Sequence, residues 1–189
     1  MSTDADQALY DAVRADDVEG AVRALCAGAN VDLNNGFLIY YAARHGLEDM
    51  VRLLLIYNAN IHGNNEEAMR VAVVVGYTPI VELLLMHGAD VHVADDFAIC
   101  VATNNGYTDM AKILVRYGAN IHARDDYPIR YAVTFGHLDT VEWLLEQGAR
   151  VDDLTMHYAL ATQRNWPIAK RLLADRAFLR DIRARAKLT

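Results

Sequence analysis

Three histidines recur at one interval along this chain, and imidazole is the commonest metal-binding side chain. They are His62, His92 and His122, each thirty residues after the last. A shared metal ion needs its ligands at about 2 Å, whereas equivalent atoms in stacked helical units lie roughly 8–10 Å apart. We therefore predict no metal site, and we expect these histidines to hydrogen-bond the turns between units.

Paired amide and acidic residues recur at nearly the same interval and could form a carboxylate cluster. The pairs are Asn34-Asn35, Asn64-Asn65, Asp95-Asp96 and Asp125-Asp126. They precede expected helices, where Asn and Asp side chains cap free backbone N–H groups. Helix capping is the interpretation that we favour, and the binding of a cation or of a basic partner is the alternative.

No catalytic motif accompanies these residues. The sequence has no phosphate-binding glycine loop, zinc-protease helix, nucleophile elbow or paired-cysteine metal motif. Its two cysteines, Cys26 and Cys100, are far apart, and we interpret both as small apolar core residues in a reducing compartment. We predict no enzyme activity, no catalytic residue and no cofactor.

Composition limits the function class further. The 189 residues are 53% hydrophobic and 23% charged, which is typical of a soluble folded protein, and the net charge is −7. An acidic chain is poorly suited to nucleic acid, whose phosphates need a basic surface. No apolar run is long enough to span a membrane, and the acidic N-terminus is not a secretory signal. We expect a cytoplasmic, monomeric protein.

Small residues mark the repeat that must position all of these side chains. Alanine recurs every thirty residues at Ala12, Ala42, Ala72, Ala102 and Ala132, and glycine recurs at Gly46, Gly76, Gly106 and Gly136. The tripeptide Gly-Ala-Asn/Asp keeps the same period at residues 28–30, 88–90 and 118–120. A fixed period of this length indicates a repeat array, in which each unit completes its core by stacking on its neighbours.

Residues 120–149 show how one unit should fold. Pro128 suits the first turn of a helix, Gly136 ends that helix, and Gly148 ends a second one. Apolar residues three and four apart give each helix one buried face: Ile129, Ala132 and Val133, then Val141, Leu144 and Leu145. Each unit is therefore predicted to be a helix-turn-helix.

This unit resembles the ankyrin repeat. The family motif Thr-Pro-Leu-His-x-Ala-Ala-x-x-Gly-His is similar to Tyr-Pro-Ile-Arg-Tyr-Ala-Val-Thr-Phe-Gly-His at residues 127–137, although the other units mostly lack Thr-Pro-Leu-His. The resemblance covers roughly residues 5–175 and implies an all-α ankyrin-repeat solenoid of about six helix-turn-helix units. The period of thirty is shorter than the usual length of about 33 residues, so we expect short fingers with almost no strand. Shortened arrays of this kind resemble those of giant viruses, bacteria and phages.

The two ends depart from the repeat, as the terminal units of a solenoid do. Asp16 replaces the inter-helix glycine in the first unit, and the last helix of the final unit is expected at Ile168 to Leu173. Residues 175–189 contain five basic and two acidic residues. We predict the repeat array at residues 1–175 and a basic C-terminal capping helix or tail at residues 176–189.

The resemblance also implies where a partner binds, because residues just before the inter-helix glycine line the concave groove of ankyrin-repeat proteins. The candidates here are Tyr41, Arg44, His45, Val74, Val75, Asn104, Asn105, Tyr131, Thr134 and Phe135. Several are apolar, and an exposed apolar patch usually marks a binding surface. The alternative is that half of them simply pack between helices.

We therefore predict a protein–protein interaction module that binds another protein through this groove. The first alternative is an acidic inhibitor or decoy that blocks a nucleic-acid-binding enzyme of a host or competitor. The second is a structural adaptor whose basic tail docks elsewhere. Salt separates the groove from the decoy, because charge-driven binding weakens steeply as salt rises and apolar binding does not.

Overall fold

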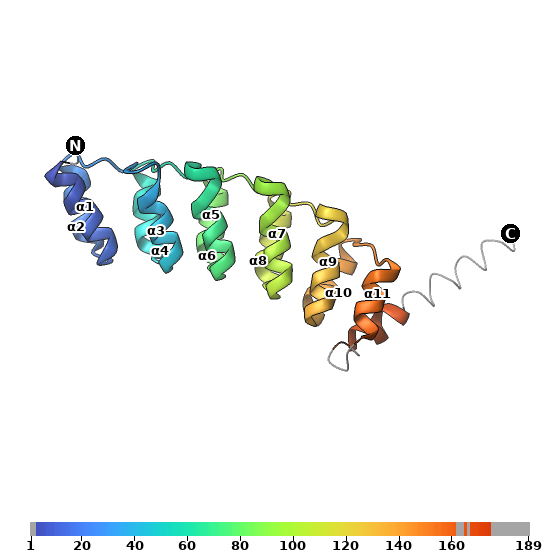
Figure 1. Cartoon of the computed structure of the whole chain (residues 1–189). Coiled ribbons are helices and arrows are strands. Elements are labelled where there is room, and N and C mark those ends of the chain that lie inside the picture. Colours follow the sequence, from blue (N-terminus) through green and yellow to red (C-terminus); the bar gives the residue numbers. More distant parts are fainter. Residues whose placement is uncertain (1–2, 162–164, 166, 175–189) are drawn as a thin grey trace, which may run out of the picture. The chain divides into compact units, whose positions relative to one another are not determined.

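Helices form all of the regular secondary structure in the described part of the chain (Figure 1). The computed structural model describes residues 3–161, 165 and 167–174, and no strand occurs among them. The helices are α1 (Asp4–Arg14), α2 (Val18–Cys26), α3 (Phe37–His45), α4 (Glu48–Ile56), α5 (Gly63–Val75), α6 (Thr78–Met86), α7 (Val93–Asn105), α8 (Thr108–Arg116), α9 (Ala123–Phe135), α10 (Leu138–Glu146) and α11 (Asp153–Leu160). Residues 167–174 are also helical. The predicted all-α fold of about six helix-turn-helix repeats is confirmed.

The chain divides into two compact units. Unit 1 comprises residues 1–98 and 112–119, and unit 2 comprises residues 99–111 and 120–189. In unit 1, α1 packs on α2, α3 on α4, and α5 on α6. The first helices of these pairs contact one another in the order α1, α3, α5, and the second helices in the order α2, α4, α6 (Figure 1). This is the sequential stacking of helix pairs that the repeat period predicts.

Equivalent apolar residues form the core of unit 1. Leu54 and Leu84, on the second helices α4 and α6, are fully buried. Ala42 and Ala72, on the first helices α3 and α5, are also fully buried, and their small side chains allow neighbouring helices to approach closely. Burial of each leucine stabilises the fold by about 1.5–3 kcal/mol, so the thirty-residue period directly specifies the packing.

In unit 2, α9 packs against both α10 and α11. The buried cluster between them includes Ile168 and Leu172 from the helical residues 167–174. The helix predicted at Ile168 to Leu173 is therefore confirmed. Residues 175–189 lie outside the described residues, so the boundary at residue 175 and the basic capping helix or tail remain predictions.

Glycine ends the first helices because the backbone there is left-handed. Gly46, Gly76 and Gly136 are the C-cap residues of α3, α5 and α9, with φ of 71°, 93° and 78°. Asp16, at the equivalent position, follows the C-cap Ala15 of α1 and is also left-handed, with φ of 55°, which a short polar side chain tolerates better than most. The predicted place of these residues between paired helices is confirmed.

Three successive left-handed residues occur in four of the turns between helix pairs, and we call these segments the left-handed turns. They are residues 34–36, 64–66, 94–96 and 124–126, all with φ between 49° and 84°. Asn and Asp enter this conformation more readily than other residues with a side chain. The recurrent pairs Asn34-Asn35, Asn64-Asn65, Asp95-Asp96 and Asp125-Asp126 all lie in these turns.

This finding corrects our interpretation of those pairs as helix caps. The N-cap residues of α3, α5 and α9 are Gly36, His62 and His122, and none of them makes a side-chain capping hydrogen bond. Asp125 and Asp126 lie inside α9, at its left-handed start. The physical reason for Asn and Asp is therefore the backbone conformation of the turn.

The placement of Cys26 is a second correction. Cys100 is buried as predicted, but Cys26 is exposed, with its Sγ 3.6 Å from the hydroxyl of Tyr57. Cys26 is the last residue of α2, and the last residues of α4 and α6, Ile56 and Met86, are 75% and 64% exposed. The end of each of these second helices therefore faces solvent, whatever the polarity of its side chain.

Candidate protein-binding surface

Unit 1 holds five of the ten predicted partner-binding residues, in the last turns of two adjacent helices. Tyr41, Arg44 and His45 belong to α3, and Val74 and Val75 belong to α5, which packs against α3. Val74 and Val75 are 50% and 42% exposed. Arg44 and His45 are exposed and Tyr41 is half-buried. The structure therefore places these five side chains on neighbouring helices and leaves all of them accessible.

Helical periodicity explains this exposure. Ala42 and Ala43 on α3, and Ala72 and Val73 on α5, are fully buried. The two residues that follow each pair continue around the helix to its solvent side. Valine is only a moderate helix former, and Val74 and Val75 leave about half of their surface exposed, so these two valines stabilise the fold less than the buried Ala72 and Val73 do.

An aromatic cluster extends this surface from α3 onto α1. The rings of Tyr10 and Phe37 are stacked with their centroids 5.9 Å apart, and the ring of Phe37 lies 6.1 Å from that of Tyr41. The imidazole of His45 follows, 4.2 Å from the Tyr41 ring. Tyr10 and Phe37 are not among the predicted residues. Phe37 lies four residues before Tyr41, on the same face of the helix, and this spacing is a signal in the sequence that identifies it.

Unit 2 holds the other five predicted residues, and they differ in accessibility. They are Asn104 and Asn105 at the end of α7, and Tyr131, Thr134 and Phe135 at the end of α9. Phe135 is 42% exposed and Asn105 is exposed, whereas the remaining three are half-buried. None of the ten residues is fully buried.

Aromatic rings also line the exposed side of α9. The ring of Tyr131 is stacked on that of Tyr127 at 3.7 Å, and the ring of Phe135 lies 6.0 Å from that of Tyr131. Burial, together with the neighbouring Tyr131, raises the pKa of the Tyr127 hydroxyl. The Tyr127 ring therefore packs against the Tyr131 ring, and Phe135 is the most exposed ring of the three.

Two of the predicted residues in unit 2 also have structural roles. The hydroxyl of Thr134 donates a hydrogen bond to the carbonyl oxygen of Arg130 at 2.8 Å. The carbonyl oxygen of Asn104 is hydrogen-bonded to Nε2 of His137 at 2.9 Å. The Thr134 hydroxyl is therefore already used within unit 2, whereas Asn104 is held by its backbone and keeps its side-chain amide. Phe135 and Asn105 are the better candidates for direct contact with a partner because both are exposed.

The recurrent histidines bind the left-handed turns in one consistent way. Nδ1 of His62 is hydrogen-bonded to Oε1 of Glu66, and Nδ1 of His92 lies 3.0 Å from Oδ1 of Asp96. His122 makes the same bond to the third residue of its turn, Asp126. The prediction that these histidines hydrogen-bond the turns is confirmed. Within the described residues, no three His, Cys, Asp or Glu side chains are placed to hold a metal ion.

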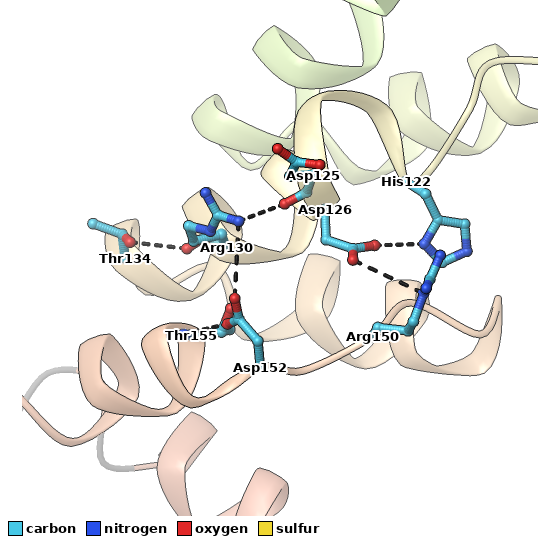
Figure 2. A network of polar contacts seen from close by, with 8 residues as sticks. All are labelled: His122, Asp125, Asp126, Arg130, Thr134, Arg150, Asp152 and Thr155. Atoms are coloured by element: carbon cyan, nitrogen blue, oxygen red, sulfur yellow. Dashed lines mark hydrogen bonds and ion pairs between the residues drawn. The ribbon is translucent and has the colours of Figure 1, made fainter.

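Asp126 belongs to a wider polar network (Figure 2). Its Oδ1 lies 2.5 Å from Nδ1 of His122, and its Oδ2 lies 3.9 Å from Nε of Arg150. Both carboxylate oxygens therefore have partners within unit 2. Asp126 is therefore not a free acidic group, whereas the side chains of Asp95 and Asp125 are exposed.

Asp152 forms the second part of this network. Its carboxylate accepts a hydrogen bond from the backbone N–H of Thr155 at 2.7 Å and lies 3.9 Å from Arg130 (Figure 2). The hydrogen bonds of Thr155 to this carboxylate lower the pKa of Asp152 below its ordinary value. Here the helix-capping role expected of an acidic residue is found, at the start of α11.

The repeated part of the chain matches a known protein family. The family described as ankyrin repeats, in three copies, matches residues 9–95, 69–155 and 98–182. No curated relative matches the chain. Among the described residues, no helix has the length and apolar character needed to cross a membrane.

Proposed function

Because this chain belongs to the ankyrin-repeat family, whose repeats generally mediate protein–protein interaction, we propose that it binds another protein through the ends of its first helices. The proposed contacts in unit 1 are Tyr41, Arg44, His45, Val74 and Val75. Those in unit 2 are Asn104, Asn105, Tyr131, Thr134 and Phe135. The protein acts as a monomeric, non-enzymatic binding module in a reducing cytoplasm.

One observation carries this proposal. Val74 and Val75 are half exposed on α5, next to an exposed histidine and arginine on α3, and they add little to the core. Exposed apolar side chains grouped in this way mark binding surfaces. Large aromatic side chains such as Tyr41 usually provide much of the binding energy of an interface.

The test begins with the partner itself. The whole chain, cross-linked in its native cells and purified by affinity, would identify candidate partners by mass spectrometry. The purified partner is then titrated against the chain and its variants. We expect Val74→Asp and Val75→Asp to weaken binding by more than about 1 kcal/mol each, because a charge replaces apolar contact area.

Unit 1 offers a matched control on another face. Ile56, at the end of the second helix α4, is 75% exposed, so Ile56→Asp introduces the same charge without disturbing the core. This variant should bind the partner normally. If Ile56→Asp abolishes binding while the two valine variants bind normally, the interface lies on the second helices and the proposed surface is wrong. Loss of binding only in variants of Asp95, Asp96, Asp125 and Asp126 would instead support the acidic decoy.

A further inference from the structure

Three arginines on the first helices of unit 1 contact aromatic side chains. Each belongs to a different helix, α1, α3 or α5. The contacts are Arg14 over the Tyr10 ring at 5.6 Å, Arg44 Nη1 to the Tyr40 hydroxyl at 2.7 Å, and Arg70 over the Phe97 ring at 5.4 Å. Among the described residues, no carboxylate forms an ion pair with any of these three guanidinium groups.

Other arginines in the described part of the chain do find carboxylates. In unit 1, Arg52 lies 2.6 Å from Glu48 on the same second helix. In unit 2, Arg130 occupies the place in α9 that Arg70 occupies in α5, and it lies 3.9 Å from Asp152. The three arginines of α1, α3 and α5 are therefore distinct: their cations are positioned by aromatic groups and have no intramolecular counter-ion.

Aromatic contacts prepare an arginine to bind an anion. A ring face or a phenol oxygen restricts the motion of the guanidinium group and displaces part of its hydration water. At Arg14, the hydrogen bond with the Tyr41 phenol, together with the nearby Tyr10, raises the pKa of the guanidinium group. Nε of Arg70 is buried and has no hydrogen-bond partner among the described residues. A planar guanidinium in this state forms a strong, paired hydrogen bond with a carboxylate.

The acidic residues on these helices do not neutralise the three cations. On α1, Asp11 accepts a hydrogen bond from Gln7 at 3.0 Å, and on α5, Glu67 accepts one from Asn64 at 3.1 Å. Unit 1 as a whole has more acidic than basic residues. A long polyanion such as nucleic acid would be repelled by this charge, whereas a short segment can meet the three arginines alone.

The spacing of the arginines further defines the ligand. Packed helices lie about 8–10 Å apart, and an extended peptide advances about 3.3 Å per residue, so one helix corresponds to roughly three peptide residues. Arg14 and Arg44 occupy equivalent places in α1 and α3, whereas Arg70 lies about one helical turn earlier in α5. Separate cations distributed in this way suit separate carboxylates. A phosphate group would need several donors converging on one point.

We propose that α1, α3 and α5 bind an extended acidic segment of the partner protein. Aspartate or glutamate side chains about three residues apart bind Arg14 and Arg44, and a further acidic side chain binds Arg70. Apolar side chains of the same segment contact Val74 and Val75. This inference rests on the proposed function and adds the chemical class of the partner.

The experiment pans a random peptide library of about twelve residues against the whole chain, and then titrates labelled peptides by fluorescence anisotropy. We expect the selected peptides to carry spaced acidic residues. The double variant Arg14→Gln/Arg44→Gln should bind them at least about tenfold more weakly, because two charge-assisted bonds are lost. The control Arg52→Gln, whose arginine already pairs with Glu48, should bind within about twofold of the parent chain.

Three results overturn the inference. The first is that no peptide is selected, and the second is that the selected peptides bind equally well after Glu→Gln and Asp→Asn replacement. The third is that an oligothymidine of the same length binds more tightly than the acidic peptide. If non-acidic peptides bind and Val75→Asp abolishes that binding, the acidic preference fails but the proposed surface stands. If neither the arginine nor the valine variants affect a peptide that binds, the proposed surface fails as well.

Discussion

Nδ1 of His62 is hydrogen-bonded to Oε1 of Glu66, the last residue of a left-handed turn, and the Glu66 side chain is almost entirely buried. The second oxygen of this carboxylate, Oε2, is buried without a hydrogen-bond partner among the described residues. The histidine therefore supplies the main side-chain partner of a buried acidic group. The same pairing recurs in the next two turns.

Replacement of this histidine should destabilise the protein. We expect His62→Ala to lower the free energy of unfolding by about 1–3 kcal/mol, because a buried carboxylate loses its donor. The measurement is urea denaturation followed by circular dichroism. In a Glu66→Gly background the same substitution should cost much less, because the acceptor is gone. Equal costs in both backgrounds would show that the pair does not contribute.

We expect a glycine substitution in a left-handed turn to stabilise the protein. Ala94 has φ of 51° and is exposed, so Ala94→Gly should raise the free energy of unfolding by about 0.5–1 kcal/mol. The reason is that glycine enters this conformation without a steric penalty, which outweighs the entropy that it loses on folding. Ala98, in the right-handed part of the same helix, is buried. Ala98→Gly should instead destabilise by about 1 kcal/mol or more, and a common sign for both variants would contradict the assigned backbone conformation.

Gly46 and Gly88 have similar backbone conformations, so alanine substitutions at the two positions distinguish the cost of backbone strain from the cost of a steric clash. A Cβ at Gly46 would lie 2.6 Å from a ring carbon of Tyr77, whereas a Cβ at Gly88 would have no heavy atom within 4 Å. Both residues have positive φ, 71° and 94°. We expect Gly88→Ala to cost about 1–2 kcal/mol for the conformation alone, and Gly46→Ala to cost a further 1–3 kcal/mol or so for the clash. Thermal and urea unfolding of both variants would check this order.

Acid should weaken the contact between the first helix pair and the turn that follows it. The backbone N–H of Asn30 donates to Asp6 at 2.7 Å, and the backbone N–H of Thr3 donates to its other oxygen at 2.7 Å. These bonds lower the pKa of Asp6 below its ordinary value. A carboxyl with a lowered folded pKa adds stability above its unfolded pKa, about 3.9, and loses that stability as the pH falls through the folded value.

The variant Asp6→Asn tests this sign. It should be less stable than the parent chain at pH 7, and the difference should shrink as the pH falls below about 4. Urea midpoints measured across this range would show the convergence. A difference that is constant with pH would mean that the charge of Asp6 plays no part.

In unit 2, we expect a substitution of Phe135 to weaken partner binding without affecting folding. Phe135 is 42% exposed at the end of α9, so Phe135→Ala should preserve the melting temperature. We expect it to weaken partner binding by more than about 1 kcal/mol, because an exposed aromatic ring at an interface is a frequent energetic anchor. Glu142→Ala, at an exposed position of the second helix α10, is the control and should bind normally. Normal binding by both variants would remove Phe135 from the proposed surface.

The sequence by itself determined the repeat and its core. Ala42 and Ala72 are buried, Gly46 and Gly76 end their helices, and Leu54 and Leu84 fill equivalent core positions, as the thirty-residue period requires. These features are local: helical spacing selects the buried face, and a left-handed C-cap selects glycine. The identity of the family follows from the same pattern.

The tertiary structure decided which polar and exposed side chains meet. The pairs Asn64-Asn65 and Asp125-Asp126 have the composition of helix caps, and only the backbone shows that they form left-handed turns. The sequence indicates that Cys26 is a core residue, but its side chain is exposed because the end of its helix faces solvent. Arg70 and Arg130 occupy equivalent places in their repeats, but one contacts the ring of Phe97 and the other the carboxylate of Asp152. Such contacts join residues some twenty or more positions apart, so the geometry of stacking, and not local spacing, determines each partner.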